Sequence, residues 1–322
     1  MSNSIQRFSV ATAFAMPEIP ARVEAVGFAD DSNPFIPTRN DGYVFRKELL
    51  REVLAFLGNP SGDALYVTGP TGSGKTSGIT EIAARLNWPV QQMTCNGRME
   101  ASDLIGHYVL SSLNPGEEPQ MRFQYGPLST AMRKGHILLL NEVDVVDPAE
   151  LSGLNDVLEG RPLVISANGG EIIKPHPMFR VVVTGNSTGN GDSTGLYQGI
   201  LMQNLAAMDR YRFTLVNYPV EAVEMTILGN AVPGIPDVIR DRMVRVANEI
   251  RALFVGQGEG QLAVTMSTRT LVRWANLALT FRGAPNAMEY ALQQALLLRA
   301  APEEAEAILR IAKDVFGESW SS

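Results

Sequence analysis

Gly69-Pro-Thr-Gly-Ser-Gly-Lys-Thr76 decides the fold, and it follows directly on the apolar run Ala64-Leu-Tyr-Val-Thr68. The stretch has the Gly-x-x-x-x-Gly-Lys-Thr form of a phosphate-binding loop, with a predicted strand before it and a predicted helix over residues 75–86 after it. Its glycines permit backbone conformations and close approaches that a side chain would block. Successive backbone N–H groups can then surround a phosphate, and the positive end of the following helix adds to this attraction.

The loop therefore predicts that the chain binds a nucleoside triphosphate. Lys75 would place its charge between the β- and γ-phosphates, and the Thr76 hydroxyl would ligate Mg²⁺. The alternative, a glycine-rich turn with a chance Lys-Thr, leaves the flanking strand and helix unexplained. The predicted nucleotide-binding residues are Gly69, Pro70, Thr71, Gly72, Ser73, Gly74, Lys75 and Thr76.

Composition bounds the class of protein. The chain has 322 residues, which is enough for one large domain and a smaller one. Its net charge of −7 argues against broad non-specific binding of nucleic acid. The single cysteine, Cys95, excludes an internal disulfide, fits a reducing cytosol, and is expected to be an ordinary strand-end residue. We see no run of the roughly 18–20 apolar residues that cross a bilayer and no signal-peptide pattern, so we expect a cytoplasmic protein.

Strand and helix patterns alternate from residue 64 onward, which predicts an α/β fold with a parallel sheet flanked by helices. In such a sheet, ligands bind beyond the carboxyl ends of the strands. The predicted strands are 64–68, 90–94, 136–140, 180–184 and 212–216. The predicted helices are 75–86, 127–134, 148–158 and 199–207.

Three other regions surround or interrupt this pattern. Residues 1–42 are rich in proline and predict an N-terminal arm, and a helix over 45–57 then leads to the first strand. Residues 106–126 and 161–175 predict protruding loops, the second of them a hairpin with its turn at 167–170. After residue 218 the pattern is only helical, with helices expected at 220–230, 236–255, 267–281, 285–299 and 302–315. We therefore expect an arm over 1–42, a large α/β domain over 43–218 and a small helical lid over 219–322.

Residues 137–144 read Ile-Leu-Leu-Leu-Asn-Glu-Val-Asp, a buried strand that ends in acidic residues. In phosphate-loop ATPases such a strand usually ends Asp-Glu, where the Asp holds the Mg²⁺ shell and the Glu polarises the attacking water. Here Asn141 replaces the Asp, so we expect weaker metal binding through Thr76 and Asn141. Glu142 is the predicted catalytic base. The alternative is that Glu142 and Asp144 form a solvated strand end.

Three further residues are candidates for contact with the triphosphate. Asn186 ends the run Arg180-Val-Val-Val-Thr-Gly-Asn186, where it can hydrogen-bond the attacking water or the γ-phosphate, although strands also end in Asn for turn reasons. Arg210 suits the charge of a transferring phosphoryl group, to which it would be supplied in trans; otherwise it forms a surface ion pair with Asp209 or a neighbour. Arg269 falls in the first turn of a predicted helix, a poor place for a cation unless an anion lies nearby. Otherwise Arg269 is a surface arginine.

These motifs together resemble the AAA+ ATPases of the MoxR-like branch, and within it the CobS type, the ATPase subunits of aerobic cobaltochelatase. The resemblance covers residues 17–280. Its narrowest signals are Pro175-His-Pro-Met-Phe-Arg180 and Gly191-Asp-Ser-Thr-Gly-Leu-Tyr197, and Met266-Ser-Thr-Arg-Thr-Leu271 also carries it.

The resemblance implies a role for each candidate residue. Lys75 and Thr76 would be the Walker A residues and Glu142 the Walker B glutamate, with ATP and Mg²⁺ as cofactors. Asn186 would be sensor 1, Arg210 the finger that acts on a neighbouring subunit, and Arg269 sensor 2. It also implies a homo-oligomeric ring, commonly a hexamer, that works with a partner carrying a von Willebrand factor A domain. The segments 106–126 and 161–175 match inserts that face the pore or the partner.

Several functions remain open at this stage. The first is a ring ATPase that remodels a partner protein, with cobalt insertion into a corrin as the runner-up; this chain has no residues that would themselves bind a corrin or cobalt. The second is a nucleotide-gated scaffold with little hydrolysis, which Asn141 would favour. The third is a nucleic-acid translocase, which the acidic charge and the few basic residues of the 161–175 hairpin, Arg161 and Lys174, make the weakest.

Overall fold

The computed structural model describes residues 4–112, 118–191, 199–254 and 262–320. Its contacts divide the chain into two units. One, the sheet unit, comprises Met1–Arg39, Lys47–Gly69 and Lys75–Val216. The other, the helical unit, comprises Asn40–Arg46, Pro70–Gly74 and Asn217–Ser322. The central residues of the phosphate loop therefore pack with the helical unit, although the loop begins and ends in the sheet unit.

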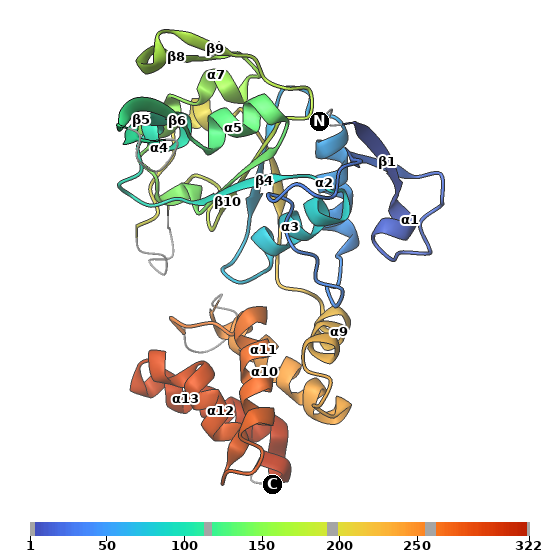
Figure 1. The fold of residues 1–322 in the computed structure, drawn as a ribbon. Coiled ribbons are helices and arrows are strands. Elements are labelled where there is room, and N and C mark those ends of the chain that lie inside the picture. The colour runs from blue at the N-terminus through green and yellow to red at the C-terminus, as the bar shows by residue number, and fades with distance from the viewer. Residues whose placement is uncertain (1–3, 113–117, 192–198, 255–261, 321–322) are drawn as a thin grey trace. The chain divides into compact units, whose positions relative to one another are not determined.

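A five-stranded parallel sheet forms the centre of the sheet unit, with strand order β11-β3-β10-β7-β4 (Figure 1). The strands are β3 (Ala64–Thr68), β4 (Val90–Thr94), β7 (Ile137–Asn141), β10 (Arg180–Gly185) and β11 (Tyr211–Leu215). Every residue of β3, β7 and β10 is buried, because helices and loops cover both faces of a sheet of this kind. The predicted parallel sheet is confirmed, and each predicted strand matches an observed one to within a residue.

Helices pack on this sheet much as the pattern predicts. The longer ones are α2 (Lys47–Gly58), α3 (Lys75–Arg85) and α5 (Pro127–Lys134). Helix α5 has proline at its start and Gly135 in the left-handed conformation at its end, as helix boundaries favour. A short helix, α4 (Ala101–Ile105), precedes it.

Two helix predictions need correction. The expected helix 148–158 is two short ones, α6 (Pro148–Ser152) and α7 (Asn155–Leu158), interrupted at Gly153 and Leu154. The expected helix 199–207 is only α8 (Leu205–Met208), because Asn204 caps the chain there by accepting from the Ala206 N–H.

Three small two-stranded sheets accompany the central one. The N-terminal arm has its own antiparallel pair, β1 (Ile5–Ser9) and β2 (Glu24–Phe28), with helix α1 (Val10–Ala13) between them. The segment expected as a loop at 106–126 is a second antiparallel pair, β5 (Gly106–Ser111) with β6 (Gln120–Tyr125). The predicted 161–175 hairpin is confirmed as β8 (Leu163–Ile165) with β9 (Glu171–Ile173).

The helical unit has a core of its own. Its helices are α9 (Glu221–Ala231), α10 (Asp237–Phe254), α11 (Thr268–Thr280), α12 (Ala287–Ala295) and α13 (Pro302–Phe316). Trp274 of α11 is fully buried among apolar side chains of its neighbours, and its indole N–H donates to the Met288 carbonyl oxygen. The helical pattern expected after residue 218 is confirmed, except that α12 ends at Ala295 and a 3₁₀ turn, Leu297–Arg299, follows. Among the described residues, no helix combines the length and apolarity needed to span a membrane.

Candidate functional site

Three motifs meet at the carboxyl ends of the strands of the central sheet. Strands β3, β10 and β7 are neighbours and run parallel, so their carboxyl ends lie together. These ends lead into Gly69, Asn186 and Asn141-Glu142, respectively. Residues separated by more than 100 positions in the chain therefore lie together at the carboxyl ends of the strands, where parallel sheets bind ligands.

Lys75 is the hub of this site. Its ammonium group donates to the Gly69 carbonyl oxygen at 2.6 Å and to Asn186 Oδ1 at 2.9 Å. Lys75 is buried, and this burial lowers its pKa to about 8, against the opposing attraction of Asp144 and Glu142. The site thus holds a partly desolvated cation that an incoming anion would stabilise.

A second group of contacts surrounds Asn141. Its Oδ1 accepts from the Thr76 hydroxyl at 2.6 Å and from the Thr184 hydroxyl at 3.2 Å. Thr76 and Asn141 supply uncharged oxygens, a donor type that Mg²⁺ uses when phosphate oxygens and water complete its shell. The described residues contain no cluster of three or more His, Cys, Asp or Glu that would hold a metal without such help. The residues present fit a magnesium ion that arrives with a nucleotide.

Glu142 has an unusual backbone. Its φ of 59° and ψ of 44° place it in the left-handed region, which a non-glycine residue rarely adopts. Its N–H donates to Thr184 Oγ1 at 3.3 Å, and its side chain is exposed. Strain of this kind persists where the surroundings enforce it, and here it turns Glu142 out of the strand direction at the end of β7.

Asp144 corrects one interpretation of the sequence. It is fully buried rather than part of a solvated strand end. Its Oδ2 accepts from the backbone N–H groups of Asn186 at 2.6 Å and of Ser187 at 3.0 Å. Asp144 therefore ties the loop after β10 to the loop after β7 and orients Asn186 toward Lys75. Neither this role nor that of Thr184 follows from the sequence pattern, although an Asp among apolar residues just past a buried strand was a usable signal.

The Cys95 thiol does not take part in this arrangement as a nucleophile. The residue is buried, its N–H donates to the Asn141 carbonyl oxygen at 2.8 Å, and burial raises the pKa of its thiol to about 12. Cys95 is the structural strand-end residue that the sequence predicts.

Arg210 lies at the opposite end of the strands, their amino end. It precedes β11, and its carbonyl oxygen accepts from the N–H of Ala64 at the start of β3. Its guanidinium pairs with Glu159, with N–O distances of 2.6 and 2.8 Å, and also donates to the Ala206 carbonyl oxygen. Within one chain, the structure does not bring Arg210 to Lys75.

The helical unit contributes the middle of the phosphate loop and the start of α11. Gly72 has a φ of +67°, and a Cβ added to it would lie 2.4 Å from the Ser267 Cβ. Ser267 caps α11 by accepting from the Thr270 N–H at 3.1 Å, and Arg269 is exposed in the first turn. The buried Ser73 hydroxyl has no hydrogen-bond partner among the described residues, a further sign that this loop is shaped for a ligand.

Gly69 shows the same close packing within the sheet unit. A Cβ at Gly69, whose φ is +143°, would lie 2.1 Å from the Val216 carbonyl oxygen. The Gly-Asp-Ser-Thr-Gly-Leu-Tyr stretch at 191–197 lies outside the described residues, apart from Gly191.

Comparisons with known proteins agree with this geometry. The family model of the AAA domain, dynein-related subfamily, matches residues 64–198, and that of the CbbQ/NirQ/NorQ C-terminal region matches residues 224–315. The chain is 32% identical over 252 residues to the aerobic cobaltochelatase subunit CobS of a Sinorhizobium species, covering 77% of this chain and 74% of that protein. The chain belongs to the AAA+ ATPases of the CobS/MoxR type. It is therefore an ATP-hydrolysing enzyme, and the resemblance stated from the sequence is confirmed.

This AAA+ ATPase is also similar to two other proteins. An uncharacterised protein of Staphylococcus haemolyticus is 28% identical over 214 residues, covering 66% of this chain and 77% of that protein. The RuvB Holliday junction branch migration motor of Thermotoga maritima has a TM-score of 0.47 and 12% identity, covering 88% of this chain and 73% of that one.

Proposed function

We propose that this AAA+ ATPase binds ATP with Mg²⁺ at Gly69–Thr76, hydrolyses it with Glu142 as the base, and uses the energy to remodel a partner protein as a ring of identical subunits. The observation that carries the hydrolytic part is the convergence on Lys75. Its ammonium group is hydrogen-bonded to the sensor candidate Asn186, 111 residues away in sequence, while the neighbouring Thr76 contacts Asn141. A buried cation and a glutamate at the same end of the sheet supply the charge and the base that phosphoryl transfer to water uses.

Each residue has a defined task in this proposal. Lys75 neutralises phosphate charge, while Thr76 and Asn141 hold the magnesium ion, which when bound offsets the charge of the phosphate oxygens. Glu142 orients and deprotonates the attacking water, and Asn186 hydrogen-bonds that water or the γ-phosphate. Arg269 adds a positive charge at the start of α11.

The position of Arg210 supports a ring. An arginine finger that cannot reach the phosphate loop of its own chain can act only on another subunit. Arg210 lies at the amino ends of the strands, whereas Lys75 lies near their carboxyl ends. In a head-to-tail ring, commonly a hexamer in this family, one subunit's Arg210 would face the next subunit's nucleotide.

Mixing two inactive variants tests both the site and the ring. Lys75→Ala lacks ATP binding but keeps Arg210, whereas Arg210→Ala keeps the phosphate loop but lacks the finger. Each variant alone should show turnover near background, and the mixture should recover part of the wild-type rate. Glu142→Gln should bind ATP and lose turnover by about 10²–10⁴-fold. Absence of recovery in a mixture shown to co-assemble would contradict the trans role, and full turnover by Glu142→Gln would remove it as the base.

The partner is proposed from the family. CobS-type ATPases imply a protein with a von Willebrand factor A domain, and the relative that matches this chain is named as a cobaltochelatase subunit, so cobalt insertion into a corrin is the alternative function. A neighbouring gene pair encoding such a domain and a corrin-binding subunit would favour the chelatase. ATP-dependent cobalt insertion by the three purified proteins would establish it, and a different set of neighbours would favour another remodelling role.

A second candidate, a nucleotide-gated scaffold, is favoured by Asn141. Its Oδ1 is occupied by two hydroxyl groups and carries no charge, so hydrolysis would be slow if the metal is held weakly. Single-turnover hydrolysis by the assembled wild-type protein decides this, with Asn141→Asp as the comparison. Fast wild-type turnover that Asn141→Asp does not raise would exclude the scaffold.

A further inference from the structure

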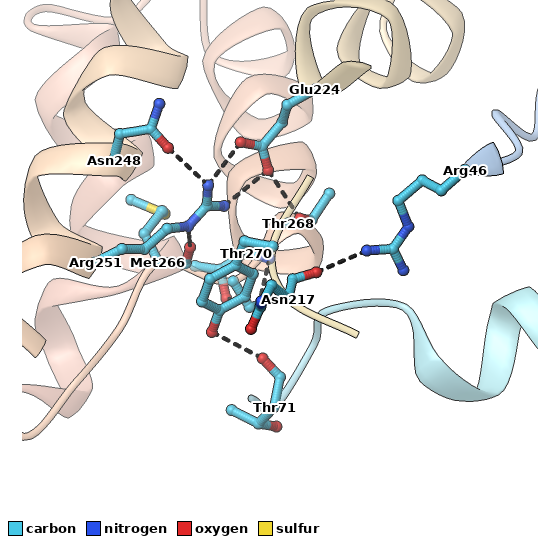
Figure 2. Close-up of polar contacts among 11 residues, drawn as sticks. Arg46, Thr71, Asn217, Glu224, Asn248, Arg251, Met266, Thr268 and Thr270 are labelled. Atoms are coloured by element: carbon cyan, nitrogen blue, oxygen red, sulfur yellow. Dashed lines mark hydrogen bonds and ion pairs between the residues drawn. The ribbon is translucent and has the colours of Figure 1, made fainter. Parts of the chain in front are cut away.

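Side chains from outside the phosphate loop hold two of its carbonyl oxygens. The Tyr218 hydroxyl donates to the Thr71 oxygen at 2.9 Å, and Arg46 donates to the Ser73 oxygen at 2.8 Å. Arg46 also donates to the Asn217 oxygen at 2.6 Å, which ties it to the residue before Tyr218 (Figure 2). The loop conformation is therefore supported by more than its glycines.

Tyr218 is in turn positioned by a buried ion pair. The guanidinium carbon of Arg251 lies 4.3 Å from the centroid of the Tyr218 ring, a cation–π contact. Arg251 makes two parallel bonds to Glu224, at 2.6 and 2.7 Å, and Glu224 is completely buried. The remaining guanidinium donors reach the Met266 oxygen at 2.7 Å and Asn248 Oδ1 at 3.1 Å, so the plane of the guanidinium under the ring is fully determined (Figure 2).

The same ion pair holds the start of α11. Glu224 Oε1 accepts from the Thr268 hydroxyl at 2.8 Å, and Arg251 binds the carbonyl oxygen of Met266. These two contacts lie on either side of Ser267, the capping residue against which Gly72 packs. One buried pair thus supports the loop through Tyr218 and the start of α11 through Met266 and Thr268.

Stability alone does not explain why this ion pair is buried. Removing two charges from water costs about as much as their attraction returns, so an apolar pair of similar volume would stabilise the core equally well or better. The pair instead helps to fix the orientation of the peptide groups in the phosphate loop. Because a trans peptide is planar with its C=O and N–H antiparallel, fixing the Thr71 and Ser73 oxygens outward also fixes the opposite direction of the Gly72 and Gly74 N–H groups.

We propose that Glu224, Arg251, Tyr218 and Arg46 are positioning residues of the ATPase site, which orient the loop N–H groups toward the β-phosphate before nucleotide binds. This inference rests on the proposed binding of ATP at Gly69–Thr76. Glycine-rich loops lose much conformational freedom on binding, and a loop held in place beforehand avoids that loss. The residues act on the part of the nucleotide that the loop surrounds, so their effect is specific to di- and triphosphates.

Tyr218→Phe is the decisive variant, because it keeps the ring beneath Arg251 and removes only the hydroxyl. Its dissociation constants for ADP and ATP, and its KM for ATP, should rise about three- to tenfold, the range for one hydrogen bond. Its affinity for AMP, measured by competition, and its thermal midpoint should stay at the wild-type values, and kcat should change less than KM. Equal affinities for ADP in Tyr218→Phe and the wild type would overturn the proposal.

The ion pair is tested by replacing both partners. The double variant Arg251→Met/Glu224→Met removes the charges together, so the thermal midpoint should hold or rise while the affinity for ADP falls at least threefold. Arg240→Met is the matched control, since Arg240 lies in the same helix, donates to the Ile235 oxygen and pairs with Asp237 without touching the loop. A double variant that binds ADP as tightly as Arg240→Met would contradict a positioning role for the pair. If the double variant does not fold, Tyr218→Phe decides alone.

Lys75→Ala separates this inference from the proposed function. If the wild type binds ATP and Lys75→Ala does not, while Tyr218→Phe binds normally, only the positioning role fails. If the wild type takes up no ATP or ADP, or Lys75→Ala binds them as the parent does, the proposed site fails and the inference fails with it.

Discussion

The sheet unit places its site residues through the backbone, whereas the helical unit places the phosphate loop through side chains. In the sheet unit, Asn141 ends β7, Asn186 follows β10 and Lys75 begins the helix after the loop that follows β3, so parallel strand pairing brings them to the same end of the sheet. In the helical unit, Tyr218 and Arg251 hold backbone oxygens by individual hydrogen bonds, and Glu224 pairs with Arg251. Positions of the first kind follow mainly from the sheet, and those of the second kind depend on individual side chains.

The largest effects are expected from adding a methyl group to the loop glycine of each unit. In Gly69→Ala the new Cβ would meet the backbone oxygen of Val216 at 2.1 Å, which the adjoining sheet holds in place; in Gly72→Ala it would meet the Ser267 side chain at 2.4 Å. Both also force alanine to a positive φ. We expect Gly69→Ala to abolish ATP binding and to lower the free energy of unfolding by about 3 kcal/mol or more. Gly72→Ala should lower it less, because Ser267 can shift.

Gly160→Ala is the matched control, with a φ of +74° and nothing within 4 Å of the new Cβ. It should cost only about 1 kcal/mol, the penalty of the left-handed conformation alone. Thermal midpoints and ADP affinities of the three variants test the predicted order, in which Gly69→Ala is the most damaged and Gly160→Ala the least. A Gly72→Ala protein more damaged than Gly69→Ala would reverse the proposed distinction between the units.

Asp144→Asn comes next in size and tests a buried side chain that supports the site at the carboxyl ends of the strands. The carboxylate is buried and accepts two backbone N–H groups, and charged hydrogen bonds of this kind are worth about 1.5–3 kcal/mol. We expect a loss of about 2 kcal/mol in stability and a fall in turnover of at least tenfold as Asn186 loosens. Asp147→Asn, an exposed helix cap that accepts from the Ala149 N–H, should be nearly neutral because Asn caps as well as Asp. Equal thermal midpoints for the two variants would show that Asp144 does not support this site.

Sequence patterns anticipate the sheet-unit site better than the helical one, for a physical reason. Buried parallel strands appear as unbroken apolar runs, and the segments that follow them meet at the carboxyl end of the sheet, so the phosphate loop with Lys75, Asn141 and Asn186 could be placed together in advance. The helical unit's Glu224 and Arg251 are 27 residues apart, and nothing local says that they pair. One signal was available: Arg251 shares a helix face with the buried Ala247 and Phe254.

Short elements were also harder to anticipate than long ones. The pair β5–β6 was expected as a loop because short apolar stretches there surround a turn-rich sequence, and most residues of its strands are exposed or half-buried. Helices α6 and α7 merge into one apolar pattern, and only the local conformation at Gly153 and Leu154 separates them. In each case packing against the rest of the sheet unit, rather than propensity, decides the boundary.

The pH dependence of ATP affinity tests Lys75, a buried titrating group of the sheet unit. Burial holds its pKa near 8 in the nucleotide-free protein, and bound phosphates would raise it. The protonated form binds, so affinity is full below pH 8 and is lost as pH rises through it, by about tenfold between pH 7 and 9. Titration calorimetry above pH 8 should show proton uptake on binding. Tyr218→Phe should show the same pH profile at weaker affinity, whereas a flat wild-type profile would contradict a buried, titrating Lys75.

The smallest effect concerns Arg210, which in the single chain is held by Glu159. The pair is about three-quarters buried at Arg210, and Glu159 also binds Arg161 at 2.7 Å, so the carboxylate competes with any phosphate for the finger. Glu159→Gln weakens this hold without removing Arg210, and we expect the ATPase rate of the assembled protein to rise about two- to threefold, as for one partly exposed ion pair. Asp156→Asn, which removes the other partner of Arg161, should leave the rate unchanged. A lower rate in Glu159→Gln would mean that Glu159 aims the finger rather than restrains it, and Arg210 would then belong with the residues that side chains position, as in the helical unit.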